Sequence, residues 1–136
     1  MEKSKLCEWE AQGEFGILTI NNPPQNYLDE LEFVFLEDLK KWTTNDLLKG
    51  IIITGKGRHF SAGANQNKVL TITDEKQIES DVRKCKAIIE YLDNLTIPTV
   101  AAIQGVCFGG GLEVALACHI RIASDKSLFC FPESGL

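Results

Sequence analysis

The segment from Ile103 to Glu113 constrains the fold of this chain most strongly. It reads I-Q-G-V-C-F-G-G-G-L-E, in which an apolar β-type run breaks at glycines and a carboxylate follows shortly after them. A strand that ends at glycines and restarts as a helix leaves unpaired N–H groups in the gap, and the helix dipole adds partial positive charge there. The segment therefore predicts a strand, loop and helix whose loop can hold negative charge.

A second loop of small residues lies upstream, after another apolar run. Its residues are Ser61, Ala62, Gly63, Ala64 and Asn65. Two such loops could each direct one backbone N–H at the same oxygen atom, which is the arrangement of an oxyanion hole. The sequence therefore indicates a site for an oxygen that becomes negatively charged.

Alternating strand and helix patterns predict an α/β fold with right-handed crossovers. Runs of apolar residues indicate the strands, and apolar residues at three- and four-residue steps indicate amphipathic helices. The expected elements are strand 16–21, helix 28–42, strand 50–54, helix 74–95 and strand 99–104. Because no linker or repeat divides the sequence, we expect residues 1–136 to form one domain or part of one.

Charge and cysteine content narrow the classes of function. A formal net charge of −5 at pH 7 disfavours nucleic acid as the main partner. The five cysteines are odd in number and no pair has C-x-x-C spacing, which argues against a disulfide framework or a zinc site. There is no apolar run of about 18 residues and no signal-peptide pattern at the start. We therefore expect a cytoplasmic protein with reduced thiols, no metal and no membrane contact.

Four segments resemble the crotonase superfamily, the enoyl-CoA hydratase/isomerase group, and they occur in the order found in that family. They are E-F-G-I-L-T-I-N-N-P-P-Q-N, G-R-H-F-S-A-G-A-N, I-P-T-V-A-A-I-Q-G-V-C-F-G-G-G-L-E-V-A-L-A-C, and the stretch from I-R-I-A-S to F-P-E-S-G-L. The resemblance implies a crotonase-type spiral of β-β-α turns. Family members are considerably longer, so it also implies an incomplete domain that stops before the C-terminal helices.

The resemblance assigns chemical roles to four residues. By position in the family motif, the amides of Ala64 and Gly110 would bind the thioester oxygen as it becomes an enolate. Glu113 and Glu133 would flank one water above the β-carbon, where Glu113 helps to activate the water and Glu133 exchanges a proton with the α-carbon. One of the two carboxyls would stay protonated near neutral pH. A glutamate at position 113 favours a hydratase over an isomerase, which generally needs only the later carboxylate.

The substrate expected from the resemblance is an acyl-CoA thioester. The residues expected to bind it are Arg58, Ala62, Gly63, Asn65 and Gly109. Arg58 lies close enough along the chain to the Ala64 loop to meet the CoA phosphates, although the phosphopantetheine of a carrier protein could use the same oxyanion hole. Coenzyme A is part of the substrate, so no separate cofactor is expected. The complete protein is expected to be a homotrimer or a dimer of trimers.

Two positions depart from the family pattern. Asn65 and His119 stand where the family usually has aspartate. The family's mechanism gives neither position a chemical role. We therefore expect altered local hydrogen bonding and the same type of reaction.

Other readings of the sequence stay open. Cys107 near the glycine-rich turn could be a thiol nucleophile with His59 or His119 as its base, although a buried small side chain is the expectation there. The basic residues of the 74–95 helix resemble a row found in an RNA-binding crotonase subfamily, but interspersed acids favour a solvated mixed face. The alternative of another class is a non-catalytic fragment or assembly module, with apolar surface exposed where further helices would pack.

Overall fold

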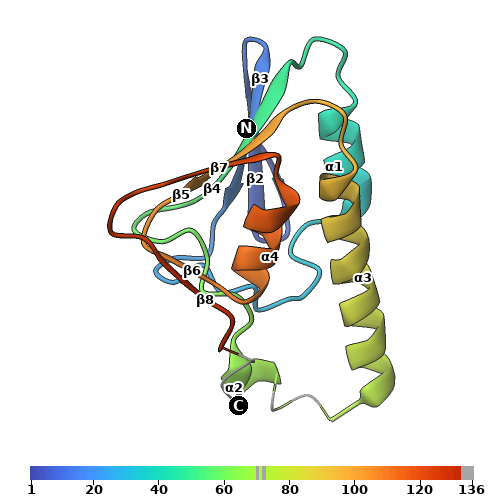
Figure 1. Ribbon diagram of the computed structural model, residues 1–136. Coiled ribbons are helices and arrows are strands. Elements are labelled where there is room, and N and C mark those ends of the chain that lie inside the picture. The colour runs from blue at the N-terminus through green and yellow to red at the C-terminus, as the bar shows by residue number, and fades with distance from the viewer. Residues whose placement is uncertain (70, 72, 133–136) are drawn as a thin grey trace.

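The computed structural model describes residues 1–69, 71 and 73–132, in which two sheets and four helices form a mixed α/β fold (Figure 1). The strands are β1 Glu2–Ser4, β2 Cys7–Gln12, β3 Phe15–Ile20, β4 Gly50–Gly55, β5 Thr99–Ile103, β6 Val106–Phe108, β7 Ile120–Ala123 and β8 Leu128–Cys130. The helices are α1 Leu36–Thr43, α2 Gln66–Val69, α3 Glu75–Asp93 and α4 Gly110–Ala117. No helix of the described residues is long and apolar enough to cross a membrane.

The large sheet has the strand order β1-β2-β3-β4-β5-β7, and β6 pairs with β8 in a second sheet. The pairs from β1 to β3 are antiparallel, whereas those from β3 through β4 and β5 to β7 are parallel. One turn of the chain places β5 in the large sheet and β6 in the second sheet before α4, and β7 and β8 again lie one in each sheet. This arrangement is the β-β-α spiral that the family resemblance implies.

The core lies between the large sheet and the helices that pack against it. Leu18, Ile20 and Ile53 from the sheet are fully buried, as are Leu39 of α1 and Ile88 of α3. In Figure 1, α1 and α3 lie along one side of the molecule, with α4 between α3 and the strands. Side chains on β3, β4 and β5 alternate between buried and partly exposed, so one face of the sheet is covered more completely than the other.

The helix predicted over residues 28–42 is wrong in its first half, because α1 begins only at Leu36. The preceding backbone is bound by other parts of the fold. The N–H of Leu28 donates to the Gly63 oxygen, and the N–H of Phe35 donates to Ser4 Oγ. Neighbouring Phe33 and Val34 are both fully buried in this segment without regular structure.

The long helix predicted over residues 74–95 is confirmed as α3. Its N-cap is Asp74, whose side chain accepts hydrogen bonds from the N–H groups of Lys76 and Gln77. Burial is uneven along the helix: Ile88 and Leu92 are buried, whereas Val82 in its first half is exposed. The first half of α3 therefore leaves this apolar side chain uncovered.

Apolar side chains are also exposed near the end of the described chain. Six of them, with exposed fractions of 41–62%, are Leu116, Ile120, Ile122, Leu128, Phe129 and Phe131. They belong to α4, β7, β8 and the residue that follows β8. This surface agrees with the expectation of apolar area left bare where further elements would pack.

Candidate active site

The two small-residue loops predicted from the sequence meet in the structure. Ser61 forms a parallel bridge with Cys107 of β6, so the first loop lies beside the strand that leads into the second. The N–H of Phe108 donates to the Ser61 oxygen over 2.9 Å, and the N–H of Ser61 donates to the Val106 oxygen over 3.2 Å. These bonds fix the 61–65 loop against the turn before α4.

The loops touch backbone to backbone because glycine occupies the contact. A Cβ built on Gly63 would lie 2.6 Å from the Phe108 oxygen and 3.0 Å from the Gly110 nitrogen. A Cβ on Gly111 would lie 2.6 Å from the Ser61 oxygen. Gly63 also has a φ of 80°, in the left-handed region that favours glycine. The glycines therefore permit an approach that any other residue would prevent.

Two amides in this contact differ from their neighbours. The N–H groups of Ala62, Gly63 and Gly109 donate to Gln25 O, Ser61 Oγ and Cys130 O, respectively. In contrast, the N–H groups of Ala64 and Gly110 form no hydrogen bond within the part of the chain that the structure describes. Gly110 is the first residue of α4, where the helix ladder supplies no acceptor and the helix dipole favours negative charge.

Glu113 lies in the first turn of α4, three residues after Gly110. Its side chain is exposed and faces a cavity of about 470 Å³. The other residues that line this cavity are Leu31, Val82, Cys85, Lys86, Ile89 and Glu90. Burial, and then the negative charge of Glu113, raise the pKa of the Cys85 thiol to about 11, so this thiol stays neutral beside the carboxylate. The second predicted carboxylate, Glu133, lies outside the described residues.

A second cavity, of about 390 Å³, opens at the other loop. Three of its lining residues, Ala62, Ala64 and Asn65, come from the predicted site. The others are Gln25, Tyr27, His59, Asn67, Val106, Phe108 and Pro132. Arg58 is exposed and lines neither cavity, although its neighbour His59 does. Of the residues expected to bind substrate, Ala62 and Asn65 line this cavity, whereas Arg58, Gly63 and Gly109 line neither cavity.

Cys107 is the buried small side chain that the sequence favoured. It has no exposed surface, and burial raises the pKa of its thiol to about 12, far from the range of an activated nucleophile. His59 and His119 each use ring Nδ1 as an acceptor, the first for the N–H of Val106 and the second for the N–H of Thr99. A thiol nucleophile with a histidine base has no support in this arrangement.

Sequence reasoning missed one segment of the site, residues 28–33, because it assigned them to a helix. Leu28 binds the Gly63 oxygen through its N–H, and Leu31 lines the cavity beside Glu113. Asp29 accepts a hydrogen bond from Asn22 and forms an ion pair with Lys68 of α2. Although burial opposes ionisation of this carboxyl, these contacts hold the pKa of Asp29 below its usual value. The apolar residues Leu28, Leu31 and Phe35 have helix-like spacing, so no pattern in the sequence pointed to this segment.

Comparison with known proteins gives consistent matches over nearly the whole chain. The family model described as enoyl-CoA hydratase/isomerase matches residues 10–136. A probable enoyl-CoA hydratase of Bacillus subtilis is 36% identical over 122 residues, which cover 89% of this chain and 47% of that protein. The alpha subunit of a fatty acid oxidation complex from Idiomarina loihiensis is 36% identical over 133 residues, which cover 93% of this chain and 19% of that protein.

Solved structures match the fold with similar coverage. Pseudomonas aeruginosa DspI superposes with a TM-score of 0.87 at 31% identity, covering 99% of this chain and 52% of that one. An enoyl-CoA hydratase of Thermoplasma volcanium superposes with a TM-score of 0.83 at 31% identity, covering 97% and 53%. The chain therefore spans about half the length of these structures and of the Bacillus protein.

Proposed function

The chain belongs to the enoyl-CoA hydratase/isomerase family, and from that premise we propose that the complete protein adds water across the 2,3 double bond of a 2-enoyl-CoA. The observation that carries the proposal is the pair of amides of Ala64 and Gly110. Both lie at one loop contact without an acceptor among the described residues, and Glu113 follows in the first turn of the same helix. Two of the relatives, from Bacillus subtilis and Thermoplasma volcanium, are named as enoyl-CoA hydratases.

The amides would act on the thioester oxygen. Attack of water at the β-carbon displaces electrons toward that oxygen, which becomes an enolate. Two fixed N–H donors aimed at the oxygen lower the barrier, and the loss of one donor in such a site costs about 2.7–4 kcal/mol. Because Ala64 and Gly110 carry small or no side chains, the substrate carbonyl can approach both backbones.

The carboxylates would move the protons. Glu113 is exposed and starts from the same helix turn as Gly110, so it can reach a water near a carbonyl held by that amide. By the family resemblance, Glu133 would exchange the proton at the α-carbon. That one of the two carboxyls stays protonated near neutral pH remains a prediction. Assembly of the complete protein into a trimer or a dimer of trimers also remains a prediction.

Coenzyme A is the acyl carrier that we propose. The cavity of about 390 Å³ at Ala64 and Asn65 has both apolar and polar side chains in its lining, as a path for pantetheine requires. Arg58 and Lys56 are exposed on the adjacent turn, where they could meet phosphates. Binding of free CoA by the protein would support CoA over a carrier protein.

Hydration can be followed by the ultraviolet absorbance of the conjugated enoyl thioester, using the protein expressed from its complete coding sequence. We expect the absorbance to fall when the protein meets short- or medium-chain 2-enoyl-CoA, and Glu113→Gln to slow the fall by several powers of ten. Glu79→Gln, an exposed change on α3, is the matched control and should leave the rate unchanged. A 3-enoyl-CoA that gains absorbance while 2-enoyl-CoA of every length persists would assign an isomerase. No reaction with either ester would favour the non-catalytic alternative.

A further inference from the structure

We propose that residues 28–33, here called the strap, form the wall of the acyl-chain pocket that sets chain-length preference, and that Lys5 is the residue that positions the strap. This inference rests on the proposed function, because it concerns where the acyl group of the same substrate lies. It assigns a specificity role to Leu31 and a positioning role to Lys5.

The strap starts at the amide pair. The Leu28 N–H donates to the Gly63 oxygen over 2.8 Å. The Leu28 side chain also lies beside Gly110, since a Cβ built on that glycine would be 3.2 Å from Leu28 Cδ1. The first residue of the strap therefore touches both loops that carry the proposed donors.

The middle of the strap reaches the apolar cavity. Leu31 lines it together with Val82, Cys85 and Ile89 of α3, and Glu113 of α4 completes that side. Gly110 and Glu113 are three residues apart, which corresponds to about 4.5 Å along the helix axis. An acyl chain whose carbonyl sits at the Gly110 amide therefore has an apolar cavity within one helical turn, and Leu31 is its wall opposite α3.

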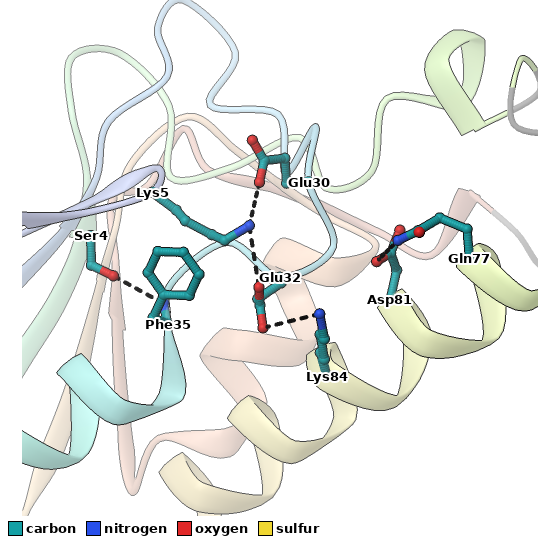
Figure 2. A network of polar contacts seen from close by, with 8 residues as sticks. All are labelled: Ser4, Lys5, Glu30, Glu32, Phe35, Gln77, Asp81 and Lys84. Atoms are coloured by element: carbon teal, nitrogen blue, oxygen red, sulfur yellow. Dashed lines mark hydrogen bonds and ion pairs between the residues drawn. The ribbon is translucent and has the colours of Figure 1, made fainter.

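Ion pairs hold the two glutamates of the strap. Figure 2 shows Lys5 Nζ between the carboxylates of Glu30 and Glu32, the two residues that flank Leu31. Lys84 Nζ of α3 lies 3.9 Å from Oε2 of Glu32, the carboxylate oxygen that does not face Lys5. Leu31 lies between these two glutamates in the sequence, and it lines the cavity. The ion pairs therefore hold the residues on both sides of Leu31.

Lys5 is well suited to hold a segment without regular structure. Its side chain is only 17% exposed, it lies 4.8 Å from the centre of the Phe35 ring, and its bond to Glu30 raises the pKa of the ammonium group. Lys5 lies in the tight turn between β1 and β2, where its φ of 51° is of the kind that hairpin turns use. Residues 28–33 belong to no helix or strand, so their position depends on contacts such as those of Lys5.

The test compares affinities for saturated acyl-CoAs from butyryl- to decanoyl-CoA, measured by calorimetry on the protein from its complete coding sequence. Leu31→Ala should favour longer chains, with about a four-fold gain in affinity for each further methylene that becomes buried. Leu31→Phe should shift the preference to shorter chains. Lys5→Gln should reduce the discrimination between chain lengths, and it should change KM for long enoyl-CoAs while leaving kcat for the shortest unchanged.

Lys49→Gln is the matched control, because it removes an exposed lysine that pairs with Glu14 away from the cavity. Its chain-length profile should equal that of the wild type. Unchanged profiles in both Leu31 variants would overturn the specificity role, and an unchanged profile in a folded Lys5→Gln would overturn the positioning role. If Lys5→Gln does not fold, the same measurement on Lys84→Gln, which frees the other side of Glu32, should show the weaker form of the same shift, and its absence would overturn the positioning role.

The outcomes separate this inference from the proposed function. Shifted binding profiles in a protein that hydrates no enoyl-CoA would support the strap and refute the hydratase. If the protein hydrates enoyl-CoA but no variant shifts its chain-length profile, the hydratase is supported and the role of the strap is refuted. A wild-type protein that binds no acyl-CoA would overturn both.

Discussion

Replacing Gly63 with alanine tests whether the two loops of the site meet backbone to backbone. The new Cβ would lie 2.6 Å from the Phe108 oxygen, and an ordinary contact requires 3.4 Å, a separation of 0.8 Å that the backbone has to supply. The obstructing atoms are main-chain atoms that no rotamer change can remove. The substitution therefore has to move the 61–65 loop away from the start of α4.

The loss of unfolding free energy in Gly63→Ala has two causes, a strained backbone and a steric clash. The same substitution at a second glycine, Gly57, separates them. Gly57 has a φ of 81°, nearly the same as the 80° of Gly63, but a Cβ on Gly57 would meet nothing within 4 Å. Gly57→Ala should therefore lose only the backbone cost of a left-handed alanine, about 1–2 kcal/mol. Gly63→Ala adds the cost of overpacking, which brings its loss of unfolding free energy to about 2–5 kcal/mol.

The effect on activity should be larger than the effect on stability. A shift of this size takes the Ala64 amide out of hydrogen-bond range of an oxygen bound at Gly110, and the loss of one donor slows turnover by about 10²–10³. The assay measures urea midpoints of both variants, and then kcat under conditions in which circular dichroism shows both folded. Equal midpoints and equal turnover for Gly63→Ala and Gly57→Ala would refute the backbone contact.

Four further predictions follow from other parts of the molecule. Asp74→Ala should lower the unfolding free energy by about 1 kcal/mol in urea titrations because α3 loses its N-cap, and Asp74→Asn, which keeps an acceptor, should lose less; equal losses would contradict the cap. The Cys107 thiol, with its pKa of about 12, should resist iodoacetamide at pH 8 until the protein is denatured, and fast alkylation of the folded protein would contradict its burial. Glu133→Gln should abolish turnover and leave acyl-CoA binding intact, whereas Gly110→Pro, at a helix position that tolerates proline, should weaken both; equal and mild effects would place neither residue in the site. Residues 1–136 alone should be nearly inactive and associate through their exposed apolar side chains, and a monodisperse, fully active monomer in light scattering would refute this.

Elements with a strong local pattern could be predicted from the sequence. The run G-I-I-I-T became β4, the run T-V-A-A-I became β5, and the long amphipathic pattern with Asp74 before it became α3. In each case the residues that decide the structure are neighbours in the chain, so the pattern contains the information. The glycine-rich turn before α4 belongs to the same group, because a glycine that can adopt positive φ is needed where the strand stops.

Other elements depend on contacts that the pattern does not contain. Residues 28–35 have helix-like spacing, but their backbone groups bind Ser4 and Gly63, which lie far away in the sequence. The strands β1 and β2 were missed, although Cys7 and Trp9 are buried and alternate with glutamates, a period-two signal that was present. The three-residue β1, at the edge of the sheet, gives no such signal and depends on its pairing with β2.

The candidate site divides in the same way. The glycines identified both loops, but the sequence could not show that Gly63 lies against Phe108 and Gly110. It also could not place Arg58, which lines neither cavity, or reveal the cavity between Leu31 and α3. These features depend on the packing of segments that are remote in the chain.

The connections among these segments imply that mutations on the two sides of the site differ in kind. Gly110 and Glu113 belong to one helix, so a displacement of α4 moves the proposed donor and the carboxylate together. Ala64 belongs to a separate loop, whose position relative to α4 depends on Gly63 and on the hydrogen bond from Leu28. Changes in that loop or in the strap therefore alter the distance between the two donors, which α4 alone cannot correct. Because oxyanion stabilisation requires both donors at one oxygen, the most sensitive positions outside the carboxylates should be those that hold the 61–65 loop against α4.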